Sequence, residues 1–552
     1  MDRRPTRLRA GRRTLEGAPR VTSDEFPRQA ARHTRRRFLT VTGAATALAF
    51  GVNVAHAASA GAATPLPGDP FTLGVASGDP LPDAVVIWTR LAPQPYEPLG
   101  GMPYQAVRVE WQVAADERFR QVVRSGTATA QPEYSYSVHV DVRGLRPARH
   151  YWYRFRIDGH LSPVGRTRTA PAPGDRPDRL TFAVASCQSW PDGYYTAHAH
   201  LAAEEVDAVL FVGDYIYEYG ISAAGGLRNT ADPVPDQFRT EADTLDRYRL
   251  QYALYKSDPD LRAAHQNTPW IGTWDDHEVQ DNYAGVYSKA LDPVEDFTVR
   301  RASAYRAYWE HMPLRTPAPQ GPDYLLYRRF TFGRLAEVNV LDTRQYRSDQ
   351  ADGDLWKPDN PGRDDPARTF AGAQQRSWLL DGMRASRATW NLLANQVVMS
   401  RMDLDASGTP TYNMDAWDGY AAEQAALLDG LAGLTARNPV VVTGDVHAAY
   451  AMDMKRDFDD PDSPTIGVEL VGTSISSGGN GVDVSVNGQN FLDHNPHLKL
   501  VNERRGYIVV ELTPHELHAA YRAVPYIDRT GAPISTIRKF TVEAGNPGLN
   551  PA

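Results

Sequence analysis

Cysteine is nearly absent from this chain of 552 residues, in which Cys187 is the single one. One thiol cannot form an intramolecular disulfide, and it cannot build a zinc site from several cysteines. A surplus of positive charge is absent as well, since 67 acidic residues outnumber 59 basic ones and give a formal net charge of −8. That balance argues against nonspecific binding of nucleic acid, which needs a basic face, but it leaves nucleic acid open as a substrate.

Extremes of composition are absent too. Apolar residues make up 42% of the chain and charged residues 23%, which argues against a disordered, collagen-like or coiled-coil protein. The 41 prolines and 43 glycines are spread along the sequence, as is typical of a globular protein rich in loops. At roughly 100–200 residues per domain, the length predicts two to four domains.

The first 57 residues differ from the rest in charge and pattern. They hold twelve arginines against four acids, a local charge of +8. Residues 34–40 read Thr-Arg-Arg-Arg-Phe-Leu-Thr, an apolar run of small residues follows over 41–54, and Ala55-His56-Ala57 closes the segment. A basic region, a short apolar core and an A-x-A site indicate an export signal, and adjacent arginines before Phe-Leu indicate the twin-arginine type.

We therefore expect the twin-arginine export machinery to recognise residues 1–57 and the mature protein to be secreted. The apolar run has roughly 14 residues where about 20 are needed to span a bilayer, and an uncleaved membrane anchor is the alternative interpretation. No other segment of the sequence is apolar enough to cross a membrane. Removing a segment of +8 from a chain of −8 leaves a mature protein at −16. Proteins exported by this route are already folded and often carry a metal, which is a first indication of a cofactor.

Residues 65–170 are expected to form a small all-β sandwich. Short strands that alternate apolar and polar residues, separated by turn residues and without a helical stretch, are typical of a sandwich of about 100 residues. The predicted strands include 84–89, 107–113, 137–142 and 151–157. The proline-rich stretch 170–177 is interpreted as a stiff linker that ends this domain.

Residues 178–530 are expected to form an α/β domain. Near-continuous apolar runs predict buried strands, and stretches with helical periodicity separate several of them. The predicted strands are 181–185, 206–212, 270–274, 336–341, 391–399, 439–442 and 467–471, and the predicted helices are 194–205, 241–255, 295–311 and 372–386. This alternation indicates an α/β or four-layer α/β/β/α domain. Two last strands, 506–513 and 516–523, are expected to be antiparallel.

Residues able to bind metals gather just after four of these strands. Open α/β sheets place their ligands at the carboxyl ends of strands, where residues remote in sequence can converge. Aspartate, histidine, tyrosine and cysteine suit transition metals, and carboxylates also suit calcium. The four clusters are Ser186-Cys187-Gln188, Gly213-Asp214-Tyr215-Ile216-Tyr217-Glu218, Asp275-Asp276-His277-Glu278 and Thr443-Gly444-Asp445-Val446-His447.

Each cluster by itself has a structural explanation. Gly-Asp after a strand is often a turn, Asp-Asp-His-Glu suits a helix N-terminus whose dipole favours acids, and a lone cysteine often behaves as a small buried hydrophobe. The histidine of Gly-Asp-x-His could equally be a satisfied residue in a turn. Four coincidences, each after its own apolar strand, explain the pattern less well than one metal centre does.

The order of the clusters resembles the metallophosphatase superfamily that includes the purple acid phosphatases. Where that superfamily has Asn-His-Glu, this chain has Asp276-His277-Glu278, and where it has Gly-His-x-His, this chain has Gly444-Asp445-Val446-His447. Ser186-Cys187-Gln188 replaces the usual opening Asp-x-His. These departures, and the run from Phe71 to Pro80, are similar to the alkaline phosphatase D family, also called PhoD-like phosphatases, over roughly residues 70–525.

The resemblance implies a centre with ferric iron, Fe3+, and calcium, Ca2+. Iron would be bound by Cys187, Asp214, Tyr217 and His447, while Asp214 would bridge to calcium and Asp276 and Asp445 would complete the calcium side. Hard Fe3+ favours anionic oxygen, thiolate and phenolate donate charge that keeps it ferric, and calcium takes carboxylate oxygens. A lone thiol in an exported protein is otherwise prone to oxidation, and iron ligation would explain why it is tolerated.

The same resemblance implies how a phosphoester is hydrolysed. The cations would neutralise charge that develops on the phosphoryl oxygens, and a metal-bound hydroxide would attack phosphorus. His277 would contact the phosphate or protonate the leaving oxygen, with orientation of a metal ligand as the alternative. Outside these motifs, Arg344 and Arg347 follow the strand 336–341 and could clamp a phosphate bidentately, with a surface ion pair as the alternative.

Three functions are consistent with these observations. The first is a secreted, metal-dependent phosphoester hydrolase that acts as an alkaline phosphatase and phosphodiesterase. The second is an iron-dependent phospholipase D that cleaves phospholipid head groups. It is disfavoured because no amphipathic membrane helix is evident and a protein at −16 would need calcium to approach anionic lipid. The third is a protein that binds the cell wall through its β-domain and carries an inert α/β domain.

Overall fold

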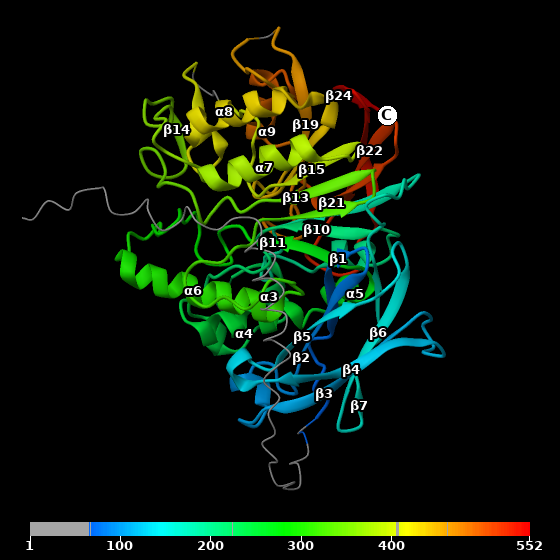
Figure 1. Ribbon diagram of the computed structural model, residues 1–552. Coiled ribbons are helices and arrows are strands. Elements are labelled where there is room, and N and C mark those ends of the chain that lie inside the picture. Colours follow the sequence, from blue (N-terminus) through cyan, green and yellow to red (C-terminus); the bar gives the residue numbers. More distant parts are fainter. Residues whose placement is uncertain (1–65, 67, 223–224, 405–407, 461) are drawn as a thin grey trace, which may run out of the picture. The chain divides into compact units, whose positions relative to one another are not determined.

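The computed structural model describes residues 66, 68–222, 225–404, 408–460 and 462–552 (Figure 1). The predicted export signal, residues 1–57, lies outside these described residues. Within the described ranges, no helix combines the length and the apolar character that a membrane crossing requires.

Two large mixed sheets form the centre of the described chain. From edge to edge, the ten-stranded sheet consists of β24 (Asn546–Pro551), β23 (Ser535–Glu543), β22 (Glu516–Val524), β21 (Arg505–Leu512), β9 (Leu180–Ala185), β10 (Ala208–Val212), β11 (Trp270–Thr273), β1 (Val75–Leu81), β2 (Ala84–Arg90) and β5 (Ser137–Arg143). The seven-stranded sheet consists of β12 (Arg328–Phe332), β13 (Ala336–Val340), β15 (Trp390–Ala394), β17 (Pro439–Thr443), β19 (Thr465–Val471), β18 (Ala449–Lys455) and β20 (Leu498–Asn502).

Helices cover the outer faces of both sheets, as Figure 1 shows for α4 (Leu245–Lys256) and α6 (Val294–His311) on one side and α7 (Ala373–Ala385) and α8 (Ala421–Ala432) on the other. Among the described residues, the remaining α-helices are α2 (Thr196–Leu201), α3 (Leu227–Ala231), α5 (Pro259–Asn267) and α9 (Val486–His494). β14 (Trp356–Pro358) pairs with β16 (Thr411–Asn413) in a small ribbon. The expected four-layer α/β/β/α arrangement is confirmed.

The near-continuous apolar runs of the central strands follow from this layering. In β9, Phe182 and Val184 pack between the two sheets, whereas Ala183 and Ala185 pack against the helical layer. Both faces of such a strand are covered, so neither face needs polar residues. The predicted antiparallel pairing of the last two strands is confirmed in β21 and β22.

The expected N-terminal β-sandwich is also present. A sheet of β4 (Val122–Ala130), β3 (Val107–Ala114), β6 (His150–Ile157), β7 (His160–Leu161) and β8 (Gly165–Arg168) packs on β1, β2 and β5 around a core that includes Val85, Tyr136 and Tyr153. Gly78 of β1 pairs in parallel with Trp270 of β11, so one layer of the sandwich continues into the ten-stranded sheet. The domain boundaries 65–170 and 178–530 stay a prediction.

Several strands were not expected from the sequence, among them β12, β18, β20, β23 and β24. β23 and β24 extend the ten-stranded sheet beyond residue 530, where the predicted catalytic domain ends. Most side chains of β23 are exposed or half-buried, so the strand carries a weak apolar pattern. The strand predicted over 391–399 is shorter in the structure, where β15 ends at Ala394.

Gly78 marks a close approach between β1 and its neighbours. A Cβ at this position would lie 2.6 Å from the carbonyl oxygens of Trp270 and Pro313. We predict that Gly78→Ala lowers the free energy of unfolding by about 1–3 kcal/mol, because backbone atoms must shift to admit the methyl group. Gly174→Ala is the matched control, since a Cβ there meets nothing within 4 Å. Urea unfolding measures both variants, and equal midpoints would contradict the close approach.

Candidate metal centre

The candidate ligands follow the carboxyl ends of four central strands. β9, β10 and β11 are parallel neighbours in the ten-stranded sheet, so the residues that follow them meet at one edge. β17 of the other sheet ends at the same place. A Cβ on Gly444, just after β17, would lie 2.7 Å from Cβ of Ser186 and 3.2 Å from Cγ2 of Val212. The two sheets thus bring together residues that are more than 250 positions apart.

The chain turns sharply after three of these strands, β9, β10 and β17. Cys187, Asp214, Asp445 and His447 all have positive φ angles, of 59°, 59°, 67° and 54°. Such a backbone is uncommon for residues other than glycine, and strain of this kind collects at functional sites. The turns let side chains from different strands point into one space.

Three overlapping groups of potential ligands result. Within each group, the donor atoms lie within 4.8 Å of one another. The groups are Cys187, Asp214 and His447; Asp214, Asp276 and His277; and Asp275, Asp276 and Asp445. Asp214 and Asp276 each belong to two groups, so the three groups form one continuous cluster. Asp275 is the member to which the sequence assigned no role at the site, because adjacent acids in one run do not reveal which of them faces the site.

Tyr217 joins the cluster through its hydroxyl group. This group lies 3.1 Å from Oδ2 of Asp214, to which it donates, and 2.9 Å from Nε2 of His447. The structure therefore brings together all six residues predicted as metal ligands: Cys187, Asp214, Tyr217, Asp276, Asp445 and His447.

The cluster carries more negative charge than the chain compensates. One buried oxygen each of Asp214, Asp275 and Asp276 has no hydrogen-bond partner among the described residues. Burial and the neighbouring Asp276 raise the pKa of Asp214 well above its usual value, and burial together with Asp214 raises the pKa of the Cys187 thiol. Desolvation lowers the pKa of His447 to about 3, which keeps the imidazole neutral, the form that binds metals. These donors fit a centre for cations.

The surroundings of Arg344 argue against the predicted role of a phosphate clamp. Its side chain has no exposed surface, because its guanidinium packs against three carboxylates. Nε lies 2.5 Å from Asp275, Nη1 lies 2.8 Å from Asp415, and Nη2 lies 3.6 Å from Asp276. Arg347 is likewise paired with Asp415, at 2.9 Å. The buried ion pairs of both arginines thus favour bracing of the acidic cluster over contact with a substrate.

His277 is held by a carboxylate that the sequence did not single out. Its Nδ1 lies 2.7 Å from Oε2 of Glu218, and its ring stacks on Tyr217 with 4.0 Å between centroids. Burial opposes the imidazolium, but Asp276 and Glu218 outweigh burial and raise the pKa of His277 well above its usual value. The imidazolium therefore lies beside the carboxylates with Nε2 free to face the centre.

Glu278 and Arg505 support the ligand loops without being candidate ligands themselves. Glu278 accepts hydrogen bonds from the backbone N–H groups of Tyr215 at 2.6 Å, Asp275 at 2.9 Å and Asp214 at 3.2 Å, and so ties two ligand loops together. Arg505 donates to the carbonyl oxygen of His447 at 2.6 Å. Most of these contacts are revealed only by the folded chain, because Tyr215, Asp214 and His447 are 58 or more positions from their partners.

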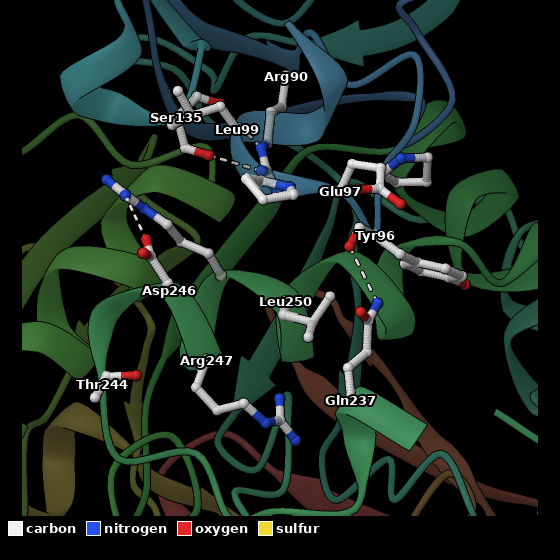
Figure 2. A pocket seen from close by; sticks show the side chains of 13 residues that line it. Arg90, Tyr96, Glu97, Leu99, Ser135, Gln237, Thr244, Asp246, Arg247 and Leu250 are labelled. Carbon is white, nitrogen blue, oxygen red and sulfur yellow. Dashed lines mark hydrogen bonds and ion pairs between the residues drawn. The ribbon is translucent and has the colours of Figure 1, made fainter. Parts of the chain in front are cut away.

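A hollow between β2 and α4 lies apart from the three groups of potential ligands (Figure 2). Two of its three arginines, Arg90 and Arg249, are already engaged in ion pairs or hydrogen bonds. Arg90 donates to the carbonyl and hydroxyl oxygens of Ser135, at 2.9 and 2.6 Å, and Arg249 pairs with Asp246 at 3.1 Å and with Glu310 at 2.7 Å. None of the residues that line this hollow belongs to the three ligand groups. It is therefore a poor candidate for a phosphate site.

The sequence and the fold of this chain are both similar to those of known phosphatases. The family model described as PhoD-like phosphatase matches residues 182–521, and the model of its N-terminal domain matches residues 56–171. The chain belongs to the PhoD-like phosphatase family. Alkaline phosphatase D of Bacillus subtilis (strain 168) is 47% identical over 525 residues, which cover 93% of this chain and 88% of that protein. A solved structure of PhoD, also 47% identical, matches with a TM-score of 0.85 over 89% of this chain and 93% of that one.

Membership of the PhoD-like phosphatases confirms the expected fold and enzyme class. The chain is a phosphoester hydrolase of metal-dependent type. This outcome favours the first predicted function over a cell-wall-binding protein with an inert α/β domain.

Repulsion among the buried acids should make metal-free protein sensitive to pH. The pKa of Asp214 is higher in the folded chain than in the unfolded chain, so stability falls as pH rises from about 4 through the raised value. We predict that Asp214→Asn removes part of this loss of stability at high pH. In the presence of a chelator at pH 9, the variant should therefore melt a few degrees above wild type. With metal restored, the variant should melt below wild type.

Asp381→Asn is the matched control, because the Asp381 side chain is 75% exposed and pairs only with Arg384 three residues away. Melting temperatures from pH 5 to pH 9, with and without chelator, decide the question. Parallel curves for wild type and Asp214→Asn would show that the cluster is not under repulsion.

Proposed function

We propose that this chain is a secreted hydrolase of phosphomonoesters and phosphodiesters whose centre holds Fe3+ and Ca2+. The observation that carries the proposal is the convergence of a thiol, a phenol, a histidine and three carboxylates at four strand ends. The family relationship supports the reaction class, and the donor chemistry supports the choice of metals.

Ferric iron suits the side formed by Cys187, Asp214, Tyr217 and His447. Three of these donors become anionic on binding, and a hard trivalent cation favours them. Burial and Asp214 raise the pKa values of Cys187 and Tyr217, so both groups keep their protons until a metal displaces them. The neutral imidazole of His447 completes the set.

Calcium suits the side formed by Asp276, Asp445 and the shared Asp214. These residues offer only carboxylate oxygens, which calcium prefers. The guanidinium of Arg344 lies 2.5 Å from Asp275 but 3.6 Å from Asp276. We therefore propose that Asp275 and Arg344 position the ligand loop and that Asp275 does not bind the cation. The free oxygens of Asp214 and Asp276 are consistent with a bridging and a terminal ligand.

When bound, these cations supply an activated water and positive charge for the phosphoryl oxygens. The chain itself supplies a proton. Glu218 accepts from Nδ1 of His277, so Nε2 of the imidazolium can donate to the leaving oxygen of the ester. Tyr217 stacks on the ring and fixes its direction.

The N-terminal sequence supports the proposed location. Adjacent arginines, the apolar run over 41–54 and the A-x-A site at 55–57 together favour a cleaved twin-arginine signal and secretion. We propose residues 1–57 as that signal, followed by a β-sandwich domain and the catalytic domain.

The assignment of iron predicts a coloured protein. Ferric phenolate should give a visible charge-transfer band, and Tyr217→Phe should abolish it while calcium stays bound. Tyr153→Phe is a control, because Tyr153 is buried in the core of the β-sandwich and belongs to none of the ligand groups. Absorption spectra with metal analysis of the purified protein test this. A colourless, iron-free protein with full activity would sink the proposal.

The assignment of His277 predicts a dependence on the leaving group. An alkoxide needs a proton to leave, whereas 4-nitrophenolate does not. We expect His277→Asn to lower kcat about 10²–10⁴-fold on glycerol phosphate and much less on 4-nitrophenyl phosphate. Glu218→Gln should produce the same pattern more weakly. Equal losses on both esters would instead assign His277 to the orientation of a metal ligand.

A further inference from the structure

A buried serine in the loop after β19 contacts two of the candidate iron ligands. Ser477 is 1% exposed, and its hydroxyl oxygen lies 2.7 Å from the phenol oxygen of Tyr217, to which it donates. The same hydroxyl oxygen lies 2.8 Å from the carbonyl oxygen of Cys187 and accepts from the backbone N–H of Ser189 at 3.0 Å. The proposed chemistry leaves Ser477 without a role, although 260 positions separate it from Tyr217 in the sequence.

The loop that carries Ser477 is fixed against the turn after β9. Its residues Ser474, Ile475, Ser476 and Ser477 are all buried. The backbone N–H of Ile475 donates to the carbonyl oxygen of Ser186 at 3.0 Å, and the hydroxyl of Ser474 donates to the carbonyl oxygen of Ser477 at 2.8 Å. The backbone of Ser477 is therefore held from two sides, and its hydroxyl is kept beside the ligands.

Arg505 of β21 anchors the same loop and reaches a third candidate iron ligand. Its Nη1 donates to the hydroxyl of Ser474 at 2.8 Å and to the carbonyl oxygen of His447 at 2.6 Å. Its Nε donates to the carbonyl oxygen of Gly479 at 2.7 Å. The loop and Arg505 together contact three of the four proposed iron ligands, namely Cys187, Tyr217 and His447.

The phenol oxygen of Tyr217 needs a hydrogen-bond donor once it binds a metal. A coordinated phenolate has no hydrogen of its own and carries negative charge, which a donor stabilises. Its side-chain contacts among the described residues are Asp214 at 3.1 Å, Nε2 of His447 at 2.9 Å and the hydroxyl of Ser477 at 2.7 Å. Asp214 and His447 are proposed ligands and direct lone pairs to the metal. Ser477 is therefore the contact that can supply the hydrogen.

The hydroxyl of Ser477 can serve Tyr217 without leaving the Cys187 carbonyl unpaired. A serine hydroxyl has one hydrogen, and the phenol oxygen and the carbonyl oxygen both lie within its reach. The backbone N–H groups of Ser476 and Ser477 also donate to that carbonyl oxygen, each at 3.3 Å. The carbonyl therefore keeps donors when the hydroxyl hydrogen points to the phenolate.

We propose that Ser477 is a positioning residue of the iron side, whose hydroxyl donates to the metal-bound oxygen of Tyr217 and holds it beside Cys187. The inference rests on the proposed function, because it assumes that Tyr217 binds Fe3+. Residues that support a metal ligand in this way typically change metal affinity by about 10–100-fold. Ser477 acts through Tyr217 and not on the substrate.

Ser477→Ala removes the hydroxyl and should move the visible charge-transfer band of the iron-loaded protein to longer wavelength. Without a hydrogen bond, the electrons of the phenolate lie higher in energy and reach the metal more easily. Affinity for Fe3+ should fall about 10–100-fold, as measured by competition with a chelator. Ser477→Thr keeps a hydroxyl and should retain both the band and the affinity.

Ser477→Val repeats the comparison with Ser477→Thr at nearly the same side-chain shape, since a methyl group replaces the hydroxyl. This pair decides the question should Ser477→Ala fail to fold. The band should lie at longer wavelength in Ser477→Val than in Ser477→Thr.

Ser476→Ala is the matched control. Ser476 is the adjacent buried serine, and its hydroxyl donates to the carbonyl oxygen of Ser189 at 2.8 Å, which belongs to no candidate ligand. Both alanine variants lose a buried hydroxyl, so their metal-free forms should melt at similar temperatures. Ser476→Ala should keep the band and the Fe3+ affinity of wild type.

Binding of Ga3+ gives a readout that depends on neither colour nor turnover. Calorimetric titration of metal-free protein with this redox-inert ion of the same charge should give the same order of affinities. Wild type, Ser477→Thr and Ser476→Ala should bind Ga3+ more tightly than Ser477→Ala and Ser477→Val.

Unchanged band and affinity in Ser477→Ala would overturn the positioning role, and so would equal bands in the Thr and Val variants. Equal changes in Ser476→Ala would overturn it as well, because they would assign the effect to packing of the loop. These results leave the iron assignment intact as long as wild type is coloured. Wild type that binds neither Fe3+ nor Ga3+ would instead contradict the proposed centre, and the inference with it.

Discussion

Negative charge enclosed at the ends of four strands is the constraint on which the rest of this structure depends. Asp214, Asp275 and Asp276 are buried, Asp445 is half-buried, and the Cys187 thiol lies beside them. Removing carboxylates from water is costly unless cations or donors replace the lost hydration. The chain supplies Arg344 and the imidazolium of His277, and bound metal ions supply the rest.

The fold withstands this repulsion because the ligands stand on rigid strands. The strands β9, β10, β11 and β17 have both faces covered, so their ends cannot move apart without exposing the core between the sheets. Each ligand with positive φ stores strain on the order of 1–3 kcal/mol. Glu278 and Arg344 then tie the loops together, which preorganises the site before any metal binds.

The surroundings of the centre divide into a charged side and an apolar side. His277 and Glu218 lie at the ligand groups, whereas Trp356, Val446 and Phe491 form a wall that carries no charge. Val446 lies between the candidate ligands Asp445 and His447, and its side chain packs in an apolar cluster with Tyr450 and Phe491.

The sequence by itself determined the layers and the general place of the centre. Apolar runs and helical periodicity are local signals, so β9, β10, β11 and β17 and the clusters that follow them were predictable from neighbouring residues. β23 was missed, because a half-exposed edge strand has little periodicity. The family resemblance then assigned ligand types to the clusters.

Only the tertiary structure decided which side chains face the centre and which support it. Arg344 looked available for phosphate, but Asp415, 71 residues away, and Asp275 occupy its guanidinium. Glu218 and Arg505 acquired roles through partners 59 and 58 residues distant. Such contacts depend on how two sheets pack against each other, and no local pattern of residues encodes that packing.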